Sequence, residues 1–389
     1  MSTLSQSRRL ARVQTPIIPI VSRWMAETPG TVSLGQGMVS YGPPQEALDA
    51  LRGFPTHVSD NKYGMVEGQA SLIRVFEAKV ARENGIDMSQ GRRAIVTAGS
   101  NQGFMNAILA ITDPGDEVIL PVPYYFNYAM AIEMAGATVV PVATDATYAF
   151  DLDAIERAIT PRTRAVVTVS PGNPTGVVHP IATLRALNGL CGKHGIFHIH
   201  DEVYEYFTYG DATHESPAAD PESAPHTISL MSLSKAYGLA SWRVGFMVFP
   251  ETLWDAINKI QDTLLVCPPI VSQHVAQAAM AVGRSYCDTQ VAVIAHAREI
   301  VATALMAPGV PCDVPAATGA FYYFIKVHTN KDSMEIAERL IREHRVAVIP
   351  GSAFGAIDSC YLRVSYGALD RSTAADGVGR LVSGLKALA

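Results

Sequence analysis

Short apolar runs alternate with helical patterns through the middle of the chain, and this alternation limits the fold more than any other feature. The predicted strands lie at Ala94–Thr97, Glu117–Leu120, Thr138–Val142, Ala165–Val169, Ile196–Ile199, Thr227–Ser232 and Val244–Val248. The predicted helices between them lie at Phe104–Ile111, Tyr124–Ala135, Asp151–Ala158 and Ile181–His194. Strands separated by helices favour a mostly parallel sheet that is covered by helices on both faces. The sequence therefore predicts an α/β fold.

A different pattern follows Pro250, with longer helices and fewer strands. Helices are predicted at Leu253–Thr263, Val271–Leu305, Ser333–His344 and Ala374–Leu388, and strands at Ala320–Ile325, Ala347–Pro350 and Leu362–Ser365. Near the N-terminus, glycines and prolines between Val32 and Pro44 predict irregular structure. We predict a large α/β domain at residues 45–275 and a smaller α+β domain formed by both termini, residues 1–44 and 276–389.

The composition argues against several classes of protein. The net charge is −6 over 389 residues, whereas nucleic-acid-binding domains are normally basic. The five cysteines include no C-x-x-C pair, so we expect a reducing compartment, no disulfide and no metal site. Residues 1–16 lack the apolar run of a secretory signal, and the longest charge-free run, residues 263–283, is too polar for a membrane span. We expect a cytoplasmic protein that binds neither nucleic acid nor membrane.

The stretch from Ser229 to Gly245 carries the strongest chemical signal. It holds Lys235 between small hydroxyl residues and places an arginine eight positions further on; its candidate site residues are Ser232, Ser234, Lys235 and Arg243. An amine can form an imine with an aldehyde, while hydroxyls and a guanidinium can hold a phosphate on the same molecule. Pyridoxal phosphate carries both groups. The alternative is a polar surface loop with a solvated lysine.

Two more loops follow predicted strands at the edge where sites form in parallel sheets. Gly99, Ser100 and Asn101 open a helix whose free N–H groups predict a phosphate seat, or else a simple helix cap. Asn173 lies between two prolines and two glycines in SPGNPTG. Its amide could donate a hydrogen bond to a phenolate oxygen, and the alternative is a plain turn.

Three further positions extend this constellation. Asp201 follows a buried strand, where a carboxylate is costly unless it is paired, and a protonated pyridine nitrogen would be a suitable partner. Tyr204 lies three positions on and could reach the neighbouring ring oxygen, whereas His200 is interpreted as a supporting or core histidine. Tyr125 could stack on a flat ring or belong to the core. Arg363 could bind a substrate carboxylate or form a salt bridge between domains.

Together these residues resemble the class I and II aminotransferases of fold type I, which use pyridoxal phosphate. The most specific motifs are SPGNPTG, DEVY and SLSKAYGLASWRVG, in that order. Asn173 precedes Asp201 by 28 residues (201 − 173), a spacing similar to that of aspartate aminotransferases. The resemblance covers nearly the whole chain. It implies a large domain with a mostly parallel seven-stranded sheet between helices, and a smaller α+β domain.

The resemblance also implies roles around the cofactor. Lys235 would form a Schiff base with it and then act as the catalytic base, and Asp201 would keep the pyridine nitrogen protonated. Tyr204 and Asn173 would hydrogen-bond the ring oxygen. The residues that would hold the phosphate are Ser100, Asn101, Ser232, Ser234 and Arg243.

Other implied roles concern the ring faces, the substrate and a second subunit. Tyr125 would stack on one face of the ring and Val203 would pack on the other. Arg363 would bind the α-carboxylate of the substrate, and Gly37 lies in a loop that would close over it. Tyr63 resembles a tyrosine that reaches the phosphate of the neighbouring subunit, which implies a homodimer with shared active sites.

The implied reaction moves an amino group from an L-amino acid to a 2-oxo acid in a ping-pong sequence. Alternatives on the same scaffold are a β-eliminating lyase, a cyclase and a cyclopropane-carboxylate synthase; a different alternative is a cofactor-binding regulatory domain without turnover. The chain has tyrosine where some relatives stack tryptophan, and we identify no second arginine for a dicarboxylate side chain. The segment Leu34–Pro44 loosely resembles that of aminotransferases for neutral or aromatic amino acids.

Overall fold

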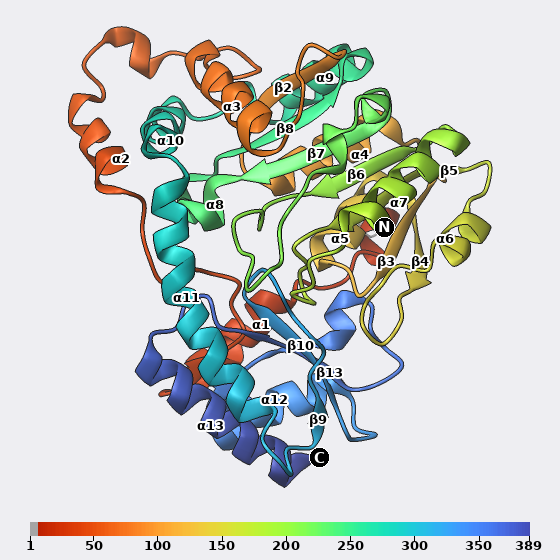
Figure 1. Ribbon diagram of the computed structural model, residues 1–389, viewed down its shortest axis with the longest axis vertical. Coiled ribbons are helices and arrows are strands. Elements are labelled where there is room, and N and C mark those ends of the chain that lie inside the picture. Colours follow the sequence, from red (N-terminus) through yellow and green to blue (C-terminus); the bar gives the residue numbers. More distant parts are fainter. Residues whose placement is uncertain (1–6) are drawn as a thin grey trace, which may run out of the picture.

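The computed structural model describes residues 7–389, and residues 1–6 of the predicted segment 1–44 lie outside the described part. Its largest sheet has seven strands in the order β2-β8-β7-β6-β5-β3-β4 (Figure 1). The strands are β2 (Arg92–Thr97), β3 (Glu117–Val122), β4 (Thr138–Ala143), β5 (Thr163–Val169), β6 (Phe197–Asp201), β7 (Thr227–Ser232) and β8 (Gly245–Pro250). The predicted mostly parallel, seven-stranded sheet is therefore confirmed.

Only β8 runs against its neighbours in this sheet. It pairs antiparallel with both β2 and β7, whereas β3, β4, β5, β6 and β7 pair in parallel. In the parallel part, Asp201 at the end of β6 stands beside Val169 at the end of β5 and Leu230 in β7. The loops that follow β5, β6 and β7 therefore leave the sheet at one common edge.

Helices cover the large sheet on both faces because its strands are apolar on both sides (Figure 1). The helices are α3 (Ala70–Glu83), α4 (Ser100–Ile111), α5 (Phe126–Ala135), α6 (Leu152–Ala158), α7 (Ile181–His194) and α9 (Trp254–Leu265). On one face, Ile108 of α4 and Ile132 of α5 pack with Ile199 of β6 in one buried cluster. On the other face, Phe76 of α3 stacks on Phe246 of β8 with ring centroids 4.0 Å apart.

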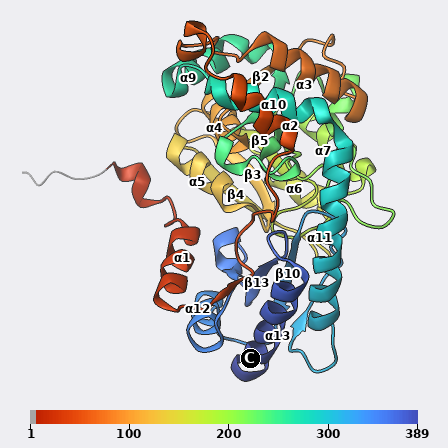
Figure 2. The ribbon, with the colours of Figure 1, turned by 90° about the vertical axis from the view of Figure 1, so that its left-hand side faces the viewer.

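A smaller antiparallel sheet carries the C-terminal part of the chain. Its strands are β9 (Cys312–Asp313), β10 (Tyr322–Val327), β12 (Ile349–Pro350) and β13 (Tyr361–Ser365), in the order β12-β13-β10-β9. The helices beside it are α1 (Ile17–Glu27), α12 (Ser333–His344) and α13 (Arg371–Leu388) (Figure 2). The expected strand Ala347–Pro350 is divided between two sheets, because β11 (Val346–Ala347) pairs elsewhere.

Two sequence-based expectations differ from the structure in detail. Val32–Ser33 forms β1, which pairs in parallel with β11, although glycines and prolines there predicted irregular structure. The long helical region expected at Val271–Leu305 is helical but is divided into α10 (Ile270–Val282) and α11 (Arg284–Leu305), because Gly283 adopts a φ of 85° that ends the first helix. The pairing of β1 is a contact between distant parts of the chain, which a local composition cannot reveal.

Helix α11 runs from the part of the molecule that holds the large sheet to the part that holds the small one (Figures 1 and 2). It packs along α13, while α10 packs against α3 and against α2 (Gln45–Ala50). The domain boundaries at residues 44–45 and 275–276 stay a prediction. Within residues 7–389, no single helix has the length and apolar character to cross a membrane, and one bent pair, Glu251–Leu265 with Ile270–Val282, has them jointly.

Candidate active site

A cavity of about 320 Å³ opens where β5, β6 and β7 end, between the large sheet and residues of the small one. All but one of the predicted site residues line it: Gly37, Ser100, Asn101, Tyr125, Asn173, Asp201, Tyr204, Ser232, Ser234, Lys235, Arg243 and Arg363. Val203 lines it as well. The exception is Tyr63, whose side chain is 85 % exposed and lines a separate surface hollow with Lys62 and Cys267.

Lys235 lies in the short helix α8 (Leu233–Ala236), directly after β7. Ser232 caps this helix, since its hydroxyl accepts a hydrogen bond from the Ser234 backbone N–H at 3.1 Å. The Lys235 ammonium Nζ donates to the backbone oxygen of Gly37 at 2.5 Å. Burial, and then the positive charges of Arg363 and Arg243, lower the pKa of Lys235 to about 8. Near neutral pH the amine is therefore easier to deprotonate than a solvated lysine.

One end of the cavity is built to receive an anion. Helix α4 begins at Ser100, so its first free N–H groups and its positive dipole end lie beside the hydroxyls of Ser232 and Ser234 in the cavity wall. Arg243 reaches this end from a left-handed backbone conformation with φ 53°, and its Nη2 atom donates to Ala98 at 3.2 Å. A Cβ atom on Gly99 would come within 2.4 Å of that Nη2, so the glycine makes room for the guanidinium.

Asp201 forms the opposite polar end and is almost fully buried. One carboxylate oxygen accepts from the Tyr128 hydroxyl at 2.6 Å, and the other accepts from the Val203 backbone N–H at 3.0 Å. Burial raises the pKa of Asp201 to about 6, although both hydrogen bonds act in the opposite direction. A carboxylate in this position is stabilised by a cation in the cavity.

A chain of hydrogen bonds connects the two parts of the molecule across the cavity. Arg363 on β13 donates to the Asn173 side-chain oxygen at 2.9 Å and to the Gly35 backbone oxygen at 2.7 Å. The Asn173 amide in turn donates to the Tyr204 hydroxyl at 3.3 Å. The Tyr204 and Tyr322 hydroxyls lie 2.8 Å apart. Asn173 and Tyr204 thus face the same space between Asp201 and Arg363.

Positive charge exceeds negative charge in this cavity. Its charged lining residues are Lys235, Arg243, Arg363 and Asp201, which sum to +2 when all are ionised (3 − 1). Arg363 is 2 % exposed, and among residues 7–389 no carboxylate forms an ion pair with it, so the structure does not have the salt bridge considered from the sequence. Its Nε atom has no hydrogen-bond partner among these residues. A buried guanidinium in this state is suited to a ligand that carries an anion.

Sequence reasoning missed three tyrosines that shape the site. Tyr128 binds Asp201, and the Tyr322 ring lies 4.6 Å from the Arg363 guanidinium carbon. Tyr41 donates to the Lys235 backbone oxygen at 2.7 Å. Tyr128 follows Tyr125 by one helical turn, which is a usable signal, whereas nothing local marks Tyr41 or Tyr322. His200 does not line the cavity; its Nδ1 atom lies 2.7 Å from the Thr168 hydroxyl.

Comparison with known proteins agrees with the motifs. The family model described as aminotransferase class I and II matches residues 29–381. An aromatic aminotransferase of Arabidopsis thaliana is 34 % identical, with 98 % of this chain and 96 % of the relative covered. An aspartate aminotransferase of Pyrococcus abyssi is 32 % identical, with 86 % and 87 % covered.

Solved structures give the same result for the fold. A single mutant of the Thermus thermophilus aspartate aminotransferase superimposes with a TM-score of 0.90 at 28 % identity, and the match covers 98 % of this chain and 100 % of that one. An aromatic aminotransferase from Pyrococcus horikoshii superimposes with a TM-score of 0.84 at 30 % identity, covering 94 % and 99 %.

The lowered pKa of Lys235 can be tested on cofactor-free protein. We expect an amine-acylating reagent to modify Lys235 with a half-maximal rate near pH 8, because burial and two arginines disfavour the ammonium form. Arg363→Leu should move this midpoint upward, since it removes one of those charges. Arg342→Leu, a change of an exposed arginine on α12, is the matched control. Peptide mass spectrometry measures the rates; a midpoint near pH 10.5 in the parent protein would contradict the assignment.

Proposed function

The chain belongs to the class I and II aminotransferases, and on that premise we propose that it binds pyridoxal phosphate in the cavity and transfers amino groups between amino acids and 2-oxo acids through Lys235. The observation that carries the proposal is the charge of the cavity lining, three cations against one carboxylate. A phosphate at one end and a substrate carboxylate at the other would balance this charge. The alternative lyase, cyclase and cyclopropane-carboxylate synthase reactions are not favoured by the family.

The residues present fit the cofactor in chemistry and in order. The phosphate would lie at the N-terminus of α4 with Ser100, Asn101, Arg243 and the two β7–α8 serines, Ser232 and Ser234. Asp201 would face the pyridine nitrogen at the other end, with Tyr125 and Val203 on the two ring faces. Asn173 and Tyr204 would meet the ring oxygen. When bound, pyridoxal phosphate supplies an aldehyde that condenses with amines and a ring that accepts the electron pair left by α-proton loss.

Lys235 and Asp201 then divide the proton chemistry. The Lys235 Nζ atom, with its lowered pKa, would take the proton from the substrate α-carbon and would return it to the carbon contributed by the cofactor's aldehyde. The Asp201 carboxylate would accept a hydrogen bond from a protonated group in the cavity, and the hydrogen bond from Tyr128 fixes the orientation of this carboxylate. Tyr204 is held by Asn173 and Tyr322, so its hydroxyl is directed before substrate arrives. Arg363 fixes the α-carboxylate through a two-point contact.

The part of the cavity available to a substrate side chain has an apolar lining. Ile18, Met38 and Phe126 supply apolar surface to the cavity, and beyond Lys235, Arg243 and Arg363 no cationic side chain of the described residues lines it. A second carboxylate on the substrate would therefore lack a cationic partner among the described residues that line the cavity. We propose an amino donor with a neutral apolar or aromatic side chain, in keeping with the name of the Arabidopsis relative.

A homodimer with shared sites is part of the proposal. Val58, Tyr63 and Met65 are exposed on one segment, and Leu264 and Val266 are exposed at the end of α9. These two segments line one hollow through Tyr63 and Leu265. An exposed apolar region of this kind suits a protein partner, and a second copy of the chain would bring its Tyr63 toward the phosphate end of this site. We retain a cytoplasmic location as a prediction.

The role of Lys235 has a direct test. After incubation with pyridoxal phosphate and borohydride reduction, we expect the pyridoxyl mass on the peptide that carries Lys235. The Lys235→Ala variant should not acquire this mass. Its rate of amino transfer should fall by at least about 10⁴-fold, because the substitution removes the nucleophile and the base together. Lys331→Ala is the control and should behave as the parent. Turnover of the Lys235→Ala variant at the parent rate would refute the proposal.

The donor class is tested by a panel of L-amino acids with 2-oxoglutarate and with pyruvate. We expect phenylalanine or methionine to exceed aspartate in kcat/KM by at least about tenfold, because an unpaired carboxylate in an apolar pocket costs more than 1.4 kcal/mol. Arg363→Leu should raise KM for every donor alike. A preference for aspartate would show that a cation outside this chain's own lining completes the site.

Shared sites predict complementation between inactive variants. Lys235→Ala and Tyr63→Ala are each expected to be weak alone. Denatured together and refolded at equal amounts, they should recover up to about a quarter of the parent activity, because half of the dimers are mixed and one of their two sites is intact. Refolding Lys235→Ala with Arg363→Leu is the control and should recover nothing, since both changes fall in the same chain's contribution. Absence of recovery in the first pair would exclude shared sites.

A further inference from the structure

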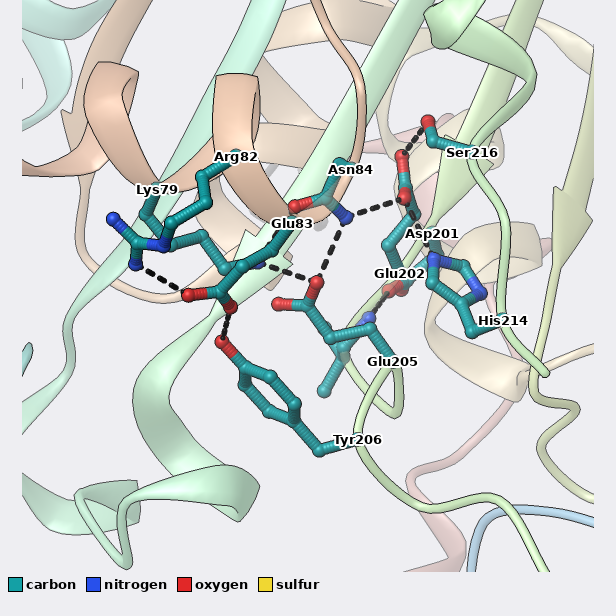
Figure 3. Close-up of polar contacts among 11 residues, drawn as sticks. Lys79, Arg82, Glu83, Asn84, Asp201, Glu202, Glu205, Tyr206, His214 and Ser216 are labelled. Atoms are coloured by element: carbon teal, nitrogen blue, oxygen red, sulfur yellow. Dashed lines mark hydrogen bonds and ion pairs between the residues drawn. The ribbon is translucent and has the colours of Figure 1, made fainter. Parts of the chain in front are cut away.

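A second carboxylate, Glu202, follows Asp201 directly and is fully buried outside the cavity. Its Oε1 atom accepts from the Ser216 hydroxyl at 2.8 Å, and its Oε2 atom accepts from His214 Nε2 at 2.9 Å and from the Asn84 amide at 3.3 Å. Figure 3 shows the carboxylate among these three donors, which come from the end of α3 and from the loop after β6. Three donors on one buried carboxylate stabilise its ionised form.

The network extends away from the cavity to a second buried ion pair. The Asn84 amide also donates to Glu205 at 2.8 Å, and its oxygen accepts from Lys79 Nζ at 2.8 Å. Lys79 and Glu205 form an ion pair that is almost as buried as Glu202. The charge of Glu205 is therefore neutralised by an adjacent ammonium. Glu202 has no Lys or Arg partner among the described residues, and its one ion-pair partner there is His214.

The charge of Glu202 reaches Asp201. Burial by itself would raise the pKa of Glu202, but the hydrogen bond and charge of His214, the charge of His200 and the Ser216 hydrogen bond lower it to about 2. Burial is the main cause of the raised pKa of Asp201, and the charge of Glu202 adds a smaller contribution of the same sign. The groups that face this pair are His200, His214 and Asn84 around Glu202, and Tyr128 on Asp201.

The same residue fixes the backbone that carries the site. The Glu202 N–H donates to the Leu230 carbonyl at 2.8 Å, and the next N–H, of Val203, donates to Asp201 at 3.0 Å. Tyr204 follows one residue later. An anchored Glu202 side chain therefore limits movement of the whole turn from Asp201 to Tyr204.

We propose that Glu202 is a positioning residue for the transfer reaction, one whose fixed negative charge, held by Asn84, His214 and Ser216, strengthens the hold of Asp201 on a protonated partner in the cavity. This inference rests on the proposed function for the identity of that partner. Glu202 does not touch the cavity, so it acts through Asp201. Its charge acts through the protein interior, where charges interact more strongly than in water.

Cofactor-free protein gives a test that does not depend on turnover. With ¹³C-labelled aspartate carboxyls, the Asp201 resonance, assigned by its loss in Asp201→Asn, should titrate near pH 6 in the parent. In Glu202→Gln the midpoint should fall below that of the parent, because removal of the neighbouring negative charge favours ionisation of Asp201. Glu202→Asp retains the charge and should keep the parent midpoint.

The loaded enzyme gives a second test. In Glu202→Gln the basic limb of the kcat/KM profile against pH should move to lower pH, in the same direction as the Asp201 titration, since the proton held at Asp201 is lost more easily. Glu205→Gln is the matched control: it removes a buried carboxylate from the same network and should lower thermal stability while leaving the profile unchanged. We expect the pyridoxyl mass on Lys235 in every variant.

Three results would overturn the inference: a parent-like Asp201 titration in folded Glu202→Gln, a shifted titration in Glu202→Asp, or an equal shift in Glu205→Gln. The last would mean that the network acts by rigidity alone. Absence of the pyridoxyl mass in the parent protein would instead refute the proposed function, and the Asp201 titration would still decide the coupling between Asp201 and Glu202.

Discussion

Three cations and one carboxylate line the same buried cavity, and this excess of positive charge shapes the site. Lys235, Arg243 and Arg363 repel one another, and only Asp201 offsets them within the lining. Burial, together with this repulsion, lowers the pKa of the lysine amine to about 8. Such an arrangement is costly in an unliganded protein. It persists because each cation is attached to a different, rigid element that does not yield to the repulsion.

These elements come from both parts of the molecule. Lys235 follows β7 and Arg243 precedes β8, so the large sheet fixes both. Arg363 lies on β13 of the small sheet and reaches across to Asn173 and to the backbone of Gly35. The cavity is therefore defined only when the two sheets stand in the observed relation. The distance between the Lys235 amine and the Arg363 guanidinium therefore depends on the relative position of the two sheets.

The two residues at the end of β6, Asp201 and Glu202, make contacts on opposite sides of the large sheet. Successive residues of a strand point to opposite faces. Asp201 accordingly turns to Tyr128 of α5, while Glu202 turns to Asn84 and to the loop that carries His214. The dipeptide thus joins the chemistry in the cavity to a polar network behind it. The turn from Asp201 to Tyr204 is thus held by hydrogen bonds on both sides of the sheet, and the charge of Glu202 acts on Asp201 from outside the cavity.

The amino-acid pattern predicted the α/β class, the mostly parallel sheet and thirteen of the residues that line the cavity, Val203 among them. It could do so because strand period, glycine–proline loops and the residue types after each strand are local signals, and residues after parallel strands meet at one edge. The packing of distant segments produced the pairing of Val32–Ser33 with β11, the contact of Tyr128 with Asp201, 73 residues away, and the contact of Tyr204 with Tyr322, 118 residues away. It also decided that Tyr63 lies away from its own chain's cavity. These contacts depend on how distant segments pack against each other, and no short stretch of sequence contains that information.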